Sequence, residues 1–387
     1  MKILTVLTYY RPHTSGLTIY VERLAKSLVK LGHEVTVLTS QYDKNLPLEE
    51  IVDGVRIIRV PVLFRVSKGV IMPTFGWLAW KLVSSHDVVH LHLPQFDAAG
   101  IALRGKILGK PTLITYHCDL LLPRSIMNRL INFVVHLMNH LAGILADRVC
   151  AYTEDFASHS PFLLRYADKL EVINPPVVMP SVSDQAIAEY RERVNPKDLS
   201  PIIGMATRFA SEKGVEILLN ALPRVLDVYP NTKVLYAGQY RDVMGETSYF
   251  QRLLPLIQTY QEKGQWEFLG VLNQEEIAQF YRCLDLLVVP SLNSTETFGL
   301  VQIEAMIQGT PSIASNLPGV RMPPRMTGMG EVVPIGDSEA LAEAILKIVN
   351  EPEKYHRDGK EVAEMFDPLI NATAYQVLYA DLLEGLS

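Results

Sequence analysis

The stretch Pro290–Gly309 reads Pro-Ser-Leu-Asn-Ser-Thr-Glu-Thr-Phe-Gly-Leu-Val-Gln-Ile-Glu-Ala-Met-Ile-Gln-Gly. Residues 284–289 before it form a short apolar run of the kind typical of a buried parallel strand. Residues 311–314 after it begin another strand. Between the two strands, a polar loop leads into a helix expected over residues 297–309, where the final glycine suits a left-handed helix end. We therefore expect a helix N-terminus beyond the carboxyl end of a strand, where open α/β sheets bind phosphates.

This stretch carries two carboxylates, Glu296 in the loop and Glu304 in the helix. Positions eight apart fall on roughly the same side of a helix. We expect the two side chains to bond separate sets of hydroxyls, as on a sugar and a ribose, with a diphosphate at the amides of Phe298, Gly299 and Leu300 between them. The alternative is that Glu296 is an ordinary acid of a first helical turn, favoured by the helix dipole, and that Glu304 lies on a solvated face.

Length and composition indicate two domains of a globular protein. A chain of 387 residues is too long for one ordinary core, and 48% apolar with 20% charged residues excludes a disordered chain. The net charge of −6 is unevenly spread, with five more basic than acidic residues in 1–180 and eleven more acidic than basic residues in 181–387. A basic first half fits an anionic acceptor or membrane surface, although ordinary variation between domains explains it equally well.

The three cysteines, Cys118, Cys150 and Cys283, have neither metal-ligand nor redox spacing, which indicates a reducing compartment. The N-terminus lacks the features of a signal peptide, and no window reaches the roughly 18 apolar residues of a membrane span. We expect a cytoplasmic protein with no nucleic-acid partner. Peripheral contact with the inner face of the membrane stays open.

The first half begins with a strand–helix–strand unit. A strand is expected over residues 3–8, a helix over 17–31 and a second strand over 35–39, joined by a right-handed crossover. Gly16 opens the helix, and a glycine there lets a phosphate or substrate approach the backbone closely. No Gly-x-Gly-x-x-Gly dinucleotide motif is present, so this glycine alone is a weak signal.

A buried strand beginning at Pro111 runs directly into His117 and Asp119. Both side chains are therefore expected at the carboxyl end of a strand, beside the crevice. A structural and a functional role for His117 are about equally consistent with this position.

The helix expected over residues 124–146 carries polar side chains at nearly helical spacing and is otherwise apolar. A narrow polar stripe predicts that most of this helix packs in the core. The alternative is a membrane or lipid-acceptor surface, which Trp77 and Trp80 nearby slightly favour.

Residues 174–180 contain three prolines, which continue neither a helix nor a central strand, so we place the interdomain linker there. The predicted domains are 1–178, on the acceptor side, and 179–365, which binds the nucleotide. A last helix over 366–387 is expected to cross back to the first domain.

In the second half, Arg208 follows a strand over 202–207, and Lys213 and Gly214 precede a helix over 215–226. Two cations at a strand-to-helix turn favour a diphosphate site, because arginine grips phosphate by its fork and lysine as a point charge. The alternative is a solvated loop. Strands and helices alternate throughout, which predicts two doubly wound Rossmann-like domains facing one another across a cleft.

With these residues placed, the chain resembles the retaining glycosyltransferases of the GT-B fold, specifically family 4, over essentially its full length. The resemblance rests on an ordered set of residues: Gly16, His117, Arg208, Lys213, Glu296 and Glu304. The Glu-x7-Glu spacing is modestly specific alone, whereas the ordered set is strong. Many relatives carry a second glycine beside the position of Gly16, where this chain has Ser15 and Leu17.

The resemblance implies that Arg208 and Lys213 bind the diphosphate of a nucleotide-sugar donor, helped by the amides of Gly16 and of residues 298–300. It implies catalytic roles for both cations.

By the same resemblance, Glu304 holds the ribose, Glu296 holds the hydroxyls of the donor sugar, and Val271 contacts the base through its backbone. His117 contacts the sugar near its sixth carbon. Glu296 and His117 would also be catalytic.

A double displacement needs a carboxylate nucleophile, for which Asp119 is the nearest candidate in the sequence. We favour a same-face substitution, which instead needs charge stabilisation of the leaving group by Arg208 and Lys213. These cations can replace a divalent ion, so no metal or other cofactor is expected.

The expected function is transfer of a hexose, with retained configuration, from a UDP- or GDP-sugar to a glycan or lipid-linked acceptor in envelope or exopolysaccharide assembly. A nucleotide-sugar epimerase and a catalytically silent nucleotide-sugar-binding protein are the alternatives.

Overall fold

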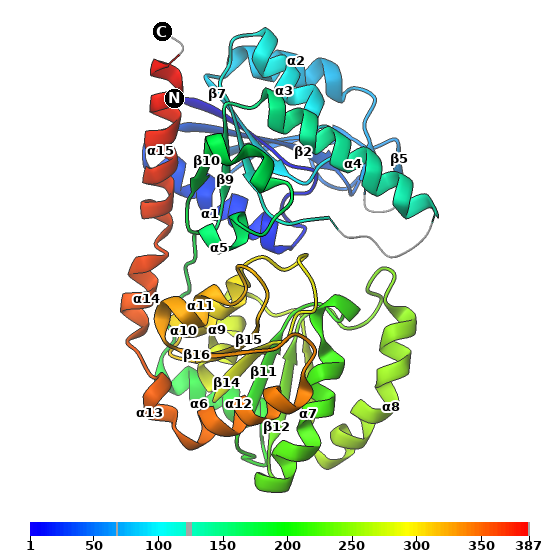
Figure 1. Cartoon of the computed structure of the whole chain (residues 1–387), viewed down its shortest axis with the longest axis vertical. Coiled ribbons are helices and arrows are strands. Elements are labelled where there is room, and N and C mark those ends of the chain that lie inside the picture. The colour runs from blue at the N-terminus through cyan, green and yellow to red at the C-terminus, as the bar shows by residue number, and fades with distance from the viewer. Residues whose placement is uncertain (67–68, 121–125, 386–387) are drawn as a thin grey trace. The chain divides into compact units, whose positions relative to one another are not determined.

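The computed structural model describes residues 1–66, 69–120 and 126–385. The chain divides into two compact units (Figure 1). Unit 1 comprises Met1–Pro176 and Phe366–Ser387, and unit 2 comprises Val177–Met365. The linker expected from the prolines contains the first of these boundaries. The start of the helix expected from residue 124, and the last two residues of the chain, lie outside the described residues.

Unit 1 is an α/β sheet with helices on both faces. Its strands are β1 (Lys2–Val6), β2 (Glu34–Gln41), β3 (Glu49–Val52), β4 (Val55–Pro61), β5 (Phe64–Val66), β6 (Gly69–Ile71), β7 (Val88–Leu93), β8 (Thr112–Tyr116), β9 (Arg148–Ala151) and β10 (Leu170–Val172). Its helices are α1 (Gly16–Lys30), α2 (Phe75–Ser85), α3 (Ala98–Ile107), α4 (Ile126–Leu145), α5 (Glu154–Ala157), the 3-10 helix η1 (Leu163–Lys169) and α15 (Pro368–Glu384).

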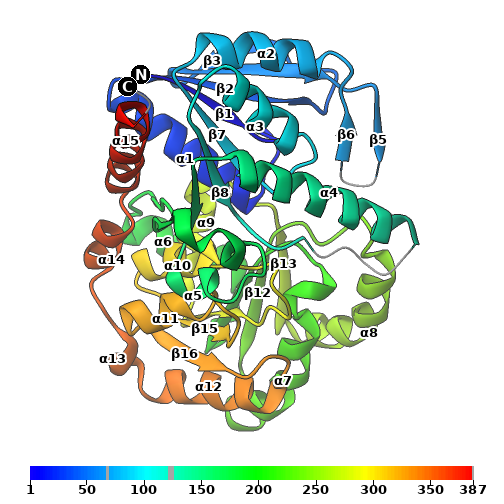
Figure 2. The ribbon, with the colours of Figure 1, turned by 45° about the horizontal axis from the view of Figure 1, so that its top comes forward.

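The main sheet of unit 1 has the order β10-β9-β8-β7-β1-β2-β4-β3, and its neighbouring strands are parallel except for β3 and β4. Helices α2, α3 and α4 lie on one face of this sheet, and α1 with α15 lies on the other (Figures 1 and 2). The strand order reverses between β1 and β7. A crevice at the carboxyl ends of these two strands is the usual ligand site of such a sheet.

Unit 2 is a second, smaller sheet of the same kind. Its strands are β11 (Ile202–Ala206), β12 (Lys233–Ala237), β13 (Trp266–Gly270), β14 (Leu286–Val289), β15 (Ser312–Ser315) and β16 (Gly330–Val333). Its helices are α6 (Asp184–Val194), the 3-10 helix η2 (Ser211–Lys213), α7 (Val215–Val228), α8 (Thr247–Lys263), α9 (Gln274–Cys283), α10 (Leu300–Ile307), α11 (Met322–Thr327), α12 (Ser338–Asn350), α13 (Pro352–Tyr355) and α14 (Gly359–Met365).

The strands of unit 2 are all parallel, in the order β13-β12-β11-β14-β15-β16. One side of the sheet packs on α7, α8 and α12, and the other on α6, α9 and α10. The order reverses between β11 and β14, so the loops that follow these two strands flank the switch point. Both units are therefore doubly wound, as the alternation of strands and helices predicts.

The helix expected over residues 297–309 is shorter than predicted, because α10 begins only at Leu300. Gly299 has φ of 75°, a left-handed conformation that a helix interior does not accommodate. Glu296 consequently lies in the loop and Glu304 in the helix, so the two carboxylates do not share one helical face.

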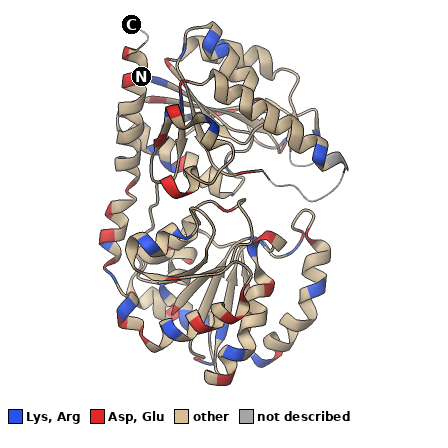
Figure 3. Ribbon diagram, viewed as in Figure 1, with Lys and Arg blue, Asp and Glu red and all other residues tan. Residues whose placement is uncertain are grey.

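Helix α4 buries less of its apolar surface than the sequence predicts. Its apolar stripe is exposed, with Phe133 65% and Ile144 66% accessible, whereas the polar Asn139 is buried and accepts a hydrogen bond from the Gln95 amide. The prediction that most of this helix packs in the core is therefore wrong. Figure 3 shows few charged residues along this helix. Within the described ranges, no helix has both the length and the apolar character needed to cross a bilayer.

Candidate functional site

The candidate site in unit 2 is built by the loops after β11 and β14. The Leu292 amide donates to the Glu212 carbonyl oxygen at 2.9 Å, which joins the two loops across the switch point. Gly214, with φ of 70°, lies where an added Cβ would clash with the carbonyl oxygen of Pro290. The chain can therefore turn into α7 this close to β14 only with glycine at this position.

This close approach brings Lys213 to Glu296. The Lys213 Nζ lies 2.6 Å from Glu296 Oε2, and the two side chains are 14% and 22% exposed. The other carboxylate oxygen, Oε1, accepts a hydrogen bond from the Gly299 amide at 3.1 Å. Glu296 therefore links a lysine to the N-terminus of α10. A cation, a carboxylate and a helix N-terminus converge there, a set that can bind phosphate and hydroxyl groups.

Arg208 lies at the carboxyl end of β11 and forms an ion pair with Glu212 one helical turn later. Its side chain is 40% exposed, so the guanidinium stays accessible from solvent. Val271 lies in the turn directly after β13 and is also exposed. The structure thus places both residues at the carboxyl edge of the sheet, as predicted.

Glu304 is buried on α10 and accepts a hydrogen bond from the Tyr281 hydroxyl at 3.0 Å. This burial excludes the alternative of a solvated helix face. Of the expected amide donors, Gly299 is bonded to Glu296, whereas Phe298 and Leu300 flank it at the start of α10.

Gly16, in unit 1, is the first residue of α1, whose N-cap Ser15 accepts from the Thr18 amide at 3.2 Å. No atom lies within 4 Å of a Cβ built on Gly16, so the backbone there is open. The helix follows the carboxyl end of β1, at the switch point of unit 1.

His117 lies at the end of β8, with 5% of its surface exposed. Its Nε2 lies 2.9 Å from His92 Nδ1, and its Nδ1 bonds the Tyr152 hydroxyl. Both ring nitrogens therefore point into unit 1. Contact of this imidazole with a substrate would require one of these two bonds to exchange.

The protons on the hydrogen-bonded rings of His92 and His117 can be assigned. His92 Nε2 is buried and has no hydrogen-bond partner among the described residues. A buried N–H without an acceptor is costly, so the His92 proton sits on Nδ1 and donates to His117 Nε2. His117 then carries its own proton on Nδ1 and donates it to Tyr152. Burial lowers the pKa of His117 to about 3, which keeps the ring neutral.

The network continues to helix α15. His90 bonds the Thr115 hydroxyl through Nε2 and the Tyr379 hydroxyl through Nδ1, both at 2.7 Å. Burial lowers the pKa of His90 to about 3 as well. Thr115 also contacts the Tyr375 hydroxyl at 2.8 Å. The last helix of the chain therefore takes part in the hydrogen-bond network that surrounds the end of β8.

Two positioning features escaped the sequence analysis. Gln302 is fully buried, and its Nε2 donates to the carbonyl oxygens of Phe298 and Val320, which fixes the turn before α10. His90 and His92 alternate in the otherwise apolar strand β7. Such a period of two marks one face of a strand and could have identified the histidine cluster. Among the described residues, no three His, Cys, Asp or Glu side chains are grouped as a metal site requires.

Comparison with known proteins gives each unit a family. The model for glycosyl transferases group 1 matches residues 186–365, and that for the glycosyl transferase 4-like domain matches residues 15–176. An uncharacterized glycosyltransferase of Methanocaldococcus jannaschii is 27% identical over 342 residues, covering 83% of this chain and 82% of the relative. The phosphatidyl-myo-inositol mannosyltransferase of Mycobacterium leprae is 26% identical over 387 residues, covering 98% and 96%.

Among solved structures, HepE of Anabaena in complex with UDP-glucose aligns with a TM-score of 0.76 at 19% identity, covering 100% of both chains. At this identity the likeness concerns the fold alone. The two matched domains, the full-length relatives and the two doubly wound sheets agree: the chain belongs to the group 1 glycosyltransferases and has the GT-B fold.

Proposed function

We propose that this glycosyltransferase transfers a hexose, with retained configuration, from a UDP- or GDP-sugar to a glycan or lipid-linked acceptor in envelope or exopolysaccharide assembly. The observation that carries the proposal is the Lys213–Glu296 pair at the switch point of unit 2, joined to the N-terminus of α10. The mycobacterial relative is a phosphatidyl-myo-inositol mannosyltransferase, and the Anabaena structure contains UDP-glucose, which supports this substrate class.

In this proposal, the donor diphosphate binds Lys213 and Arg208. Each cation has a carboxylate partner, Glu296 and Glu212 respectively. A diphosphate brings more negative charge than either carboxylate and would be held by both cations. Because Arg208 is partly exposed, exchanging its ion pair costs little.

The remainder of the donor binds beside the diphosphate. Glu296, once Lys213 turns to phosphate, accepts hydrogen bonds from sugar hydroxyls, and the amides of residues 298–300 and of Gly16 donate to phosphate oxygens. The buried Glu304 accepts from the ribose. Val271 meets the base through its backbone.

His117 contributes mainly as a positioning residue. Its ring nitrogens are bonded within unit 1, and its own amide donates to the Leu93 carbonyl oxygen at 2.9 Å. The residue therefore fixes the backbone at the carboxyl ends of β7 and β8. Contact with the sugar near its sixth carbon belongs to the proposal as the family resemblance implies it.

The reaction proceeds by same-face substitution. The bond between the anomeric carbon and the diphosphate oxygen breaks while the acceptor oxygen attacks from the same side, and the leaving diphosphate accepts the acceptor's proton. Lys213 and Arg208 stabilise the charge that develops on the leaving group, so the proposal requires no metal cofactor. Asp119 is the candidate nucleophile for the alternative mechanism, a double displacement. One of its carboxylate oxygens accepts hydrogen bonds from the hydroxyls of Tyr116 and Ser160, both at 2.9 Å.

A donor panel tests the function. Nucleotide release from UDP- and GDP-hexoses, with and without lipid or glycan acceptors and in the presence of a chelator, should depend on the acceptor and not on added metal. An isomerised sugar formed from the donor alone would indicate an epimerase. Tight donor binding without release would indicate a silent binding protein. Retention is checked from the anomeric configuration of the product.

The lipid-linked acceptor class is supported by α4. Its exposed apolar residues recur every three or four positions and form one stripe: Leu130, Phe133, Leu137, Leu141 and Ile144. On helix α2, which packs on α3 on the same face of the sheet, Trp77 is 72% exposed with Lys81 beside its ring. An apolar helix face with flanking tryptophan and basic residues suits the surface of a membrane, and we include this peripheral contact in the proposal.

Substituting Phe133→Asp should weaken binding to anionic lipid vesicles about tenfold, since burial of one large apolar side chain is worth about 1.5–3 kcal/mol. Co-sedimentation with vesicles measures the effect. Val377→Asp, at a comparably exposed position on α15, serves as the control and should bind as the wild type does. Equal binding of both variants would remove α4 from the proposed membrane surface.

A further inference from the structure

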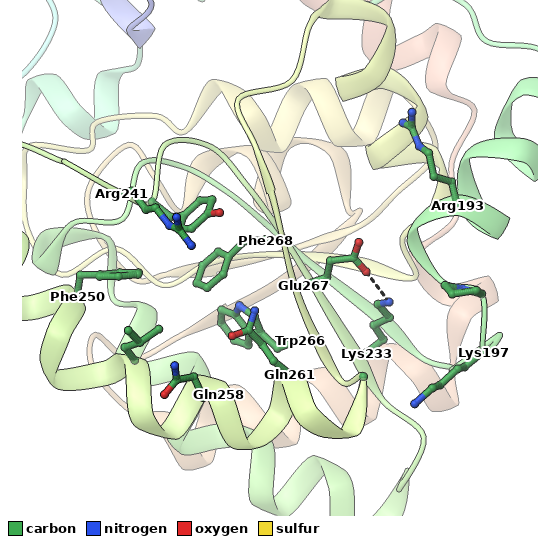
Figure 4. A pocket seen from close by; sticks show the side chains of 14 residues that line it. Arg193, Lys197, Lys233, Arg241, Phe250, Gln258, Gln261, Trp266, Glu267 and Phe268 are labelled. Carbon is green, nitrogen blue, oxygen red and sulfur yellow. Dashed lines mark hydrogen bonds and ion pairs between the residues drawn. The ribbon is translucent and has the colours of Figure 1, made fainter.

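A groove runs along the outer side of β13 in unit 2, between α6 and α8 (Figure 4). We call it the β13 groove. It has a volume of about 600 Å³, which lies within the range of ligand-binding clefts. The residues that line it and carry the following argument include Arg193, Lys197, Tyr240, Gln258, Gln261 and Phe268. None of these residues belongs to the proposed donor site.

The floor of the groove is an open sheet edge. Strand β13 pairs with β12 on one side and, among the described residues, with no strand on the other. An edge strand presents unpaired backbone N–H and C=O groups, which an extended peptide can pair by adding a strand. The side chains of such a peptide would alternate between the two faces of the sheet.

The face toward α8 is mainly aromatic. Trp266 and Phe268 lie two residues apart on β13 and pack on this side with α8. Gln258 and Gln261 of α8 border the groove there (Figure 4). The Trp266 Nε1 is buried without a hydrogen-bond partner in the described part of the chain. Trp266 itself is buried, so the partly exposed Phe268 offers the apolar surface of this half to a partner side chain.

The ring of Tyr240 on the same side already has two partners. Phe268 stacks on it at 4.2 Å between centroids and 10° between planes, and the Arg241 guanidinium lies 5.4 Å from its centroid. Since sugars bind aromatic rings through an open face, this arrangement favours a peptide over a glycan.

The face toward α6 is cationic. Lys233 pairs with Glu267 at 2.8 Å, whereas Arg193 and Lys197 make longer contacts. Arg193 lies 3.9 Å from Glu276, and the Lys197 Nζ contacts a backbone oxygen of Lys263 at 3.4 Å. Such contacts are weak and easily exchanged. Arg193 and Lys197 thus form a basic patch within residues 181–387, where acidic residues exceed basic ones by eleven. This patch complements the charge of an acidic partner.

We propose that the β13 groove binds an extended segment of a partner protein in which apolar and acidic residues alternate. The segment adds a strand to β13. Its apolar side chains lie against Phe268 and α8, and its carboxylates meet Arg193 and Lys197. This interaction is independent of the proposed transfer reaction.

The test uses the full-length protein and labelled peptides of about eight residues, a little longer than a typical strand. An alternating Leu-Glu peptide should bind at least about tenfold more tightly than a peptide of the same composition with its leucines and glutamates in separate blocks. An alternating Leu-Lys peptide should not bind. Fluorescence anisotropy measures all three affinities.

Methylation of peptide amide nitrogens tests strand addition directly. Methylating one set of alternate amides should abolish binding, whereas methylating the other set should leave it, because only one edge of the peptide faces β13. Equal effects of both sets, or equal affinity of the alternating and block peptides, would overturn the proposal.

Charge-reversal variants locate the site. Arg193→Glu and Lys197→Glu should each weaken the Leu-Glu peptide about tenfold, while Lys360→Glu, at an exposed position on α14, should not. All three variants should keep wild-type nucleotide release, so failure here is distinct from failure of the proposed function.

Tighter binding of an acidic oligosaccharide than of the peptide would assign the groove to a glycan. Self-association lost in Lys197→Glu would assign it to a second copy of the chain.

Discussion

The two units carry different chemistry at the carboxyl ends of strands near their switch points. In unit 1, the ends of β7 and β8 hold a buried network of neutral rings and hydroxyls, with His117 bonded at both nitrogens. In unit 2, the loops after β11 and β14 hold the charged, partly exposed pair Lys213–Glu296. Both positions follow the ends of strands near a point where the strand order reverses.

This difference indicates different roles for the two units in binding the donor. The network of unit 1 carries no positive charge to offset that of a diphosphate, but it can hold a backbone rigidly in place. A lysine paired with a carboxylate at a helix N-terminus can exchange its partner for phosphate. We therefore assign binding of the charged donor diphosphate to unit 2, and the rigid scaffold around His117 to unit 1. The following variants and conditions test these two roles.

The largest effects are expected from substituting the two members of the Lys213–Glu296 pair. Loss of the cation in Lys213→Ala should lower the rate of nucleotide release by about 10²–10³-fold, as for removal of one stabilising group from a charged transition state. It should also weaken nucleotide binding. Glu296→Ala should abolish transfer with only a modest loss of nucleotide affinity, since the carboxylate contacts the sugar in the proposal. Steady-state kinetics and calorimetric titration with UDP or GDP separate the two effects.

Lys347→Ala is the matched control for Lys213→Ala. It removes a lysine of the same unit that pairs with Glu331, also at 2.6 Å, on helix α12. The control should keep wild-type kinetics. Wild-type turnover in Lys213→Ala or Glu296→Ala would refute the proposal that unit 2 binds the charged donor diphosphate.

A smaller effect, on stability, is expected from Gly214→Ala. The residue has φ of 70°, and its new Cβ would meet the Pro290 carbonyl oxygen, so the loops after β11 and β14 must separate. Positive φ costs about 1 kcal/mol and the overpacking about 1–3 kcal/mol more. Denaturant unfolding should therefore report a loss of about 3 kcal/mol, together with reduced nucleotide release.

Gly245→Ala isolates the contribution of φ alone. Gly245 has φ of 83°, and nothing lies within 4 Å of its added Cβ. Its substitution should cost only about 1 kcal/mol and leave activity unchanged. Equal stability losses in the two variants would mean that the contact between Gly214 and Pro290 does not hold the loops together.

The sequence was sufficient to predict the alternating architecture and the positions of Arg208, Lys213 and Glu296 at strand ends. These features depend on local patterns: an apolar β-branched run, a loop and a helix. The pairing of Lys213 with Glu296 could not be predicted in the same way, because these residues are 83 positions apart and meet through the close approach of Gly214 to Pro290.

Side-chain environments set by tertiary packing were the least predictable part. The apolar pattern of α4 gave the period of its stripe but not the direction that the stripe faces, because a helix bound to a partner surface and a core helix share one periodicity. The role of Gln302 depends on the carbonyl groups of Phe298 and Val320, which no local pattern identifies. Helix α8 contains Pro255, which obscures its helical signal.

The smallest of the three effects concerns pH. Burial lowers the pKa of His90 and His117 to about 3 and also lowers that of His92. In the unfolded chain these groups take up protons near pH 6.5, whereas in the folded chain they stay neutral. Stability is therefore lost as the pH falls below 6.5. Between pH 7.5 and 6, His90 and His117 should each remove about 1 kcal/mol, and His92 should act in the same direction.

Nine of the ten histidines of the chain precede Pro176, and unit 2 contains only His356. Acid should therefore destabilise unit 1 selectively. Hydrogen exchange, corrected for the intrinsic effect of pH, should show reduced protection in β7 and β8 at pH 6 and little change in β11 and β14. Equal changes in both sheets would contradict the picture of a neutral scaffold in unit 1. Unchanged protection in β7 and β8 would mean that the buried histidines do take up protons in the folded state.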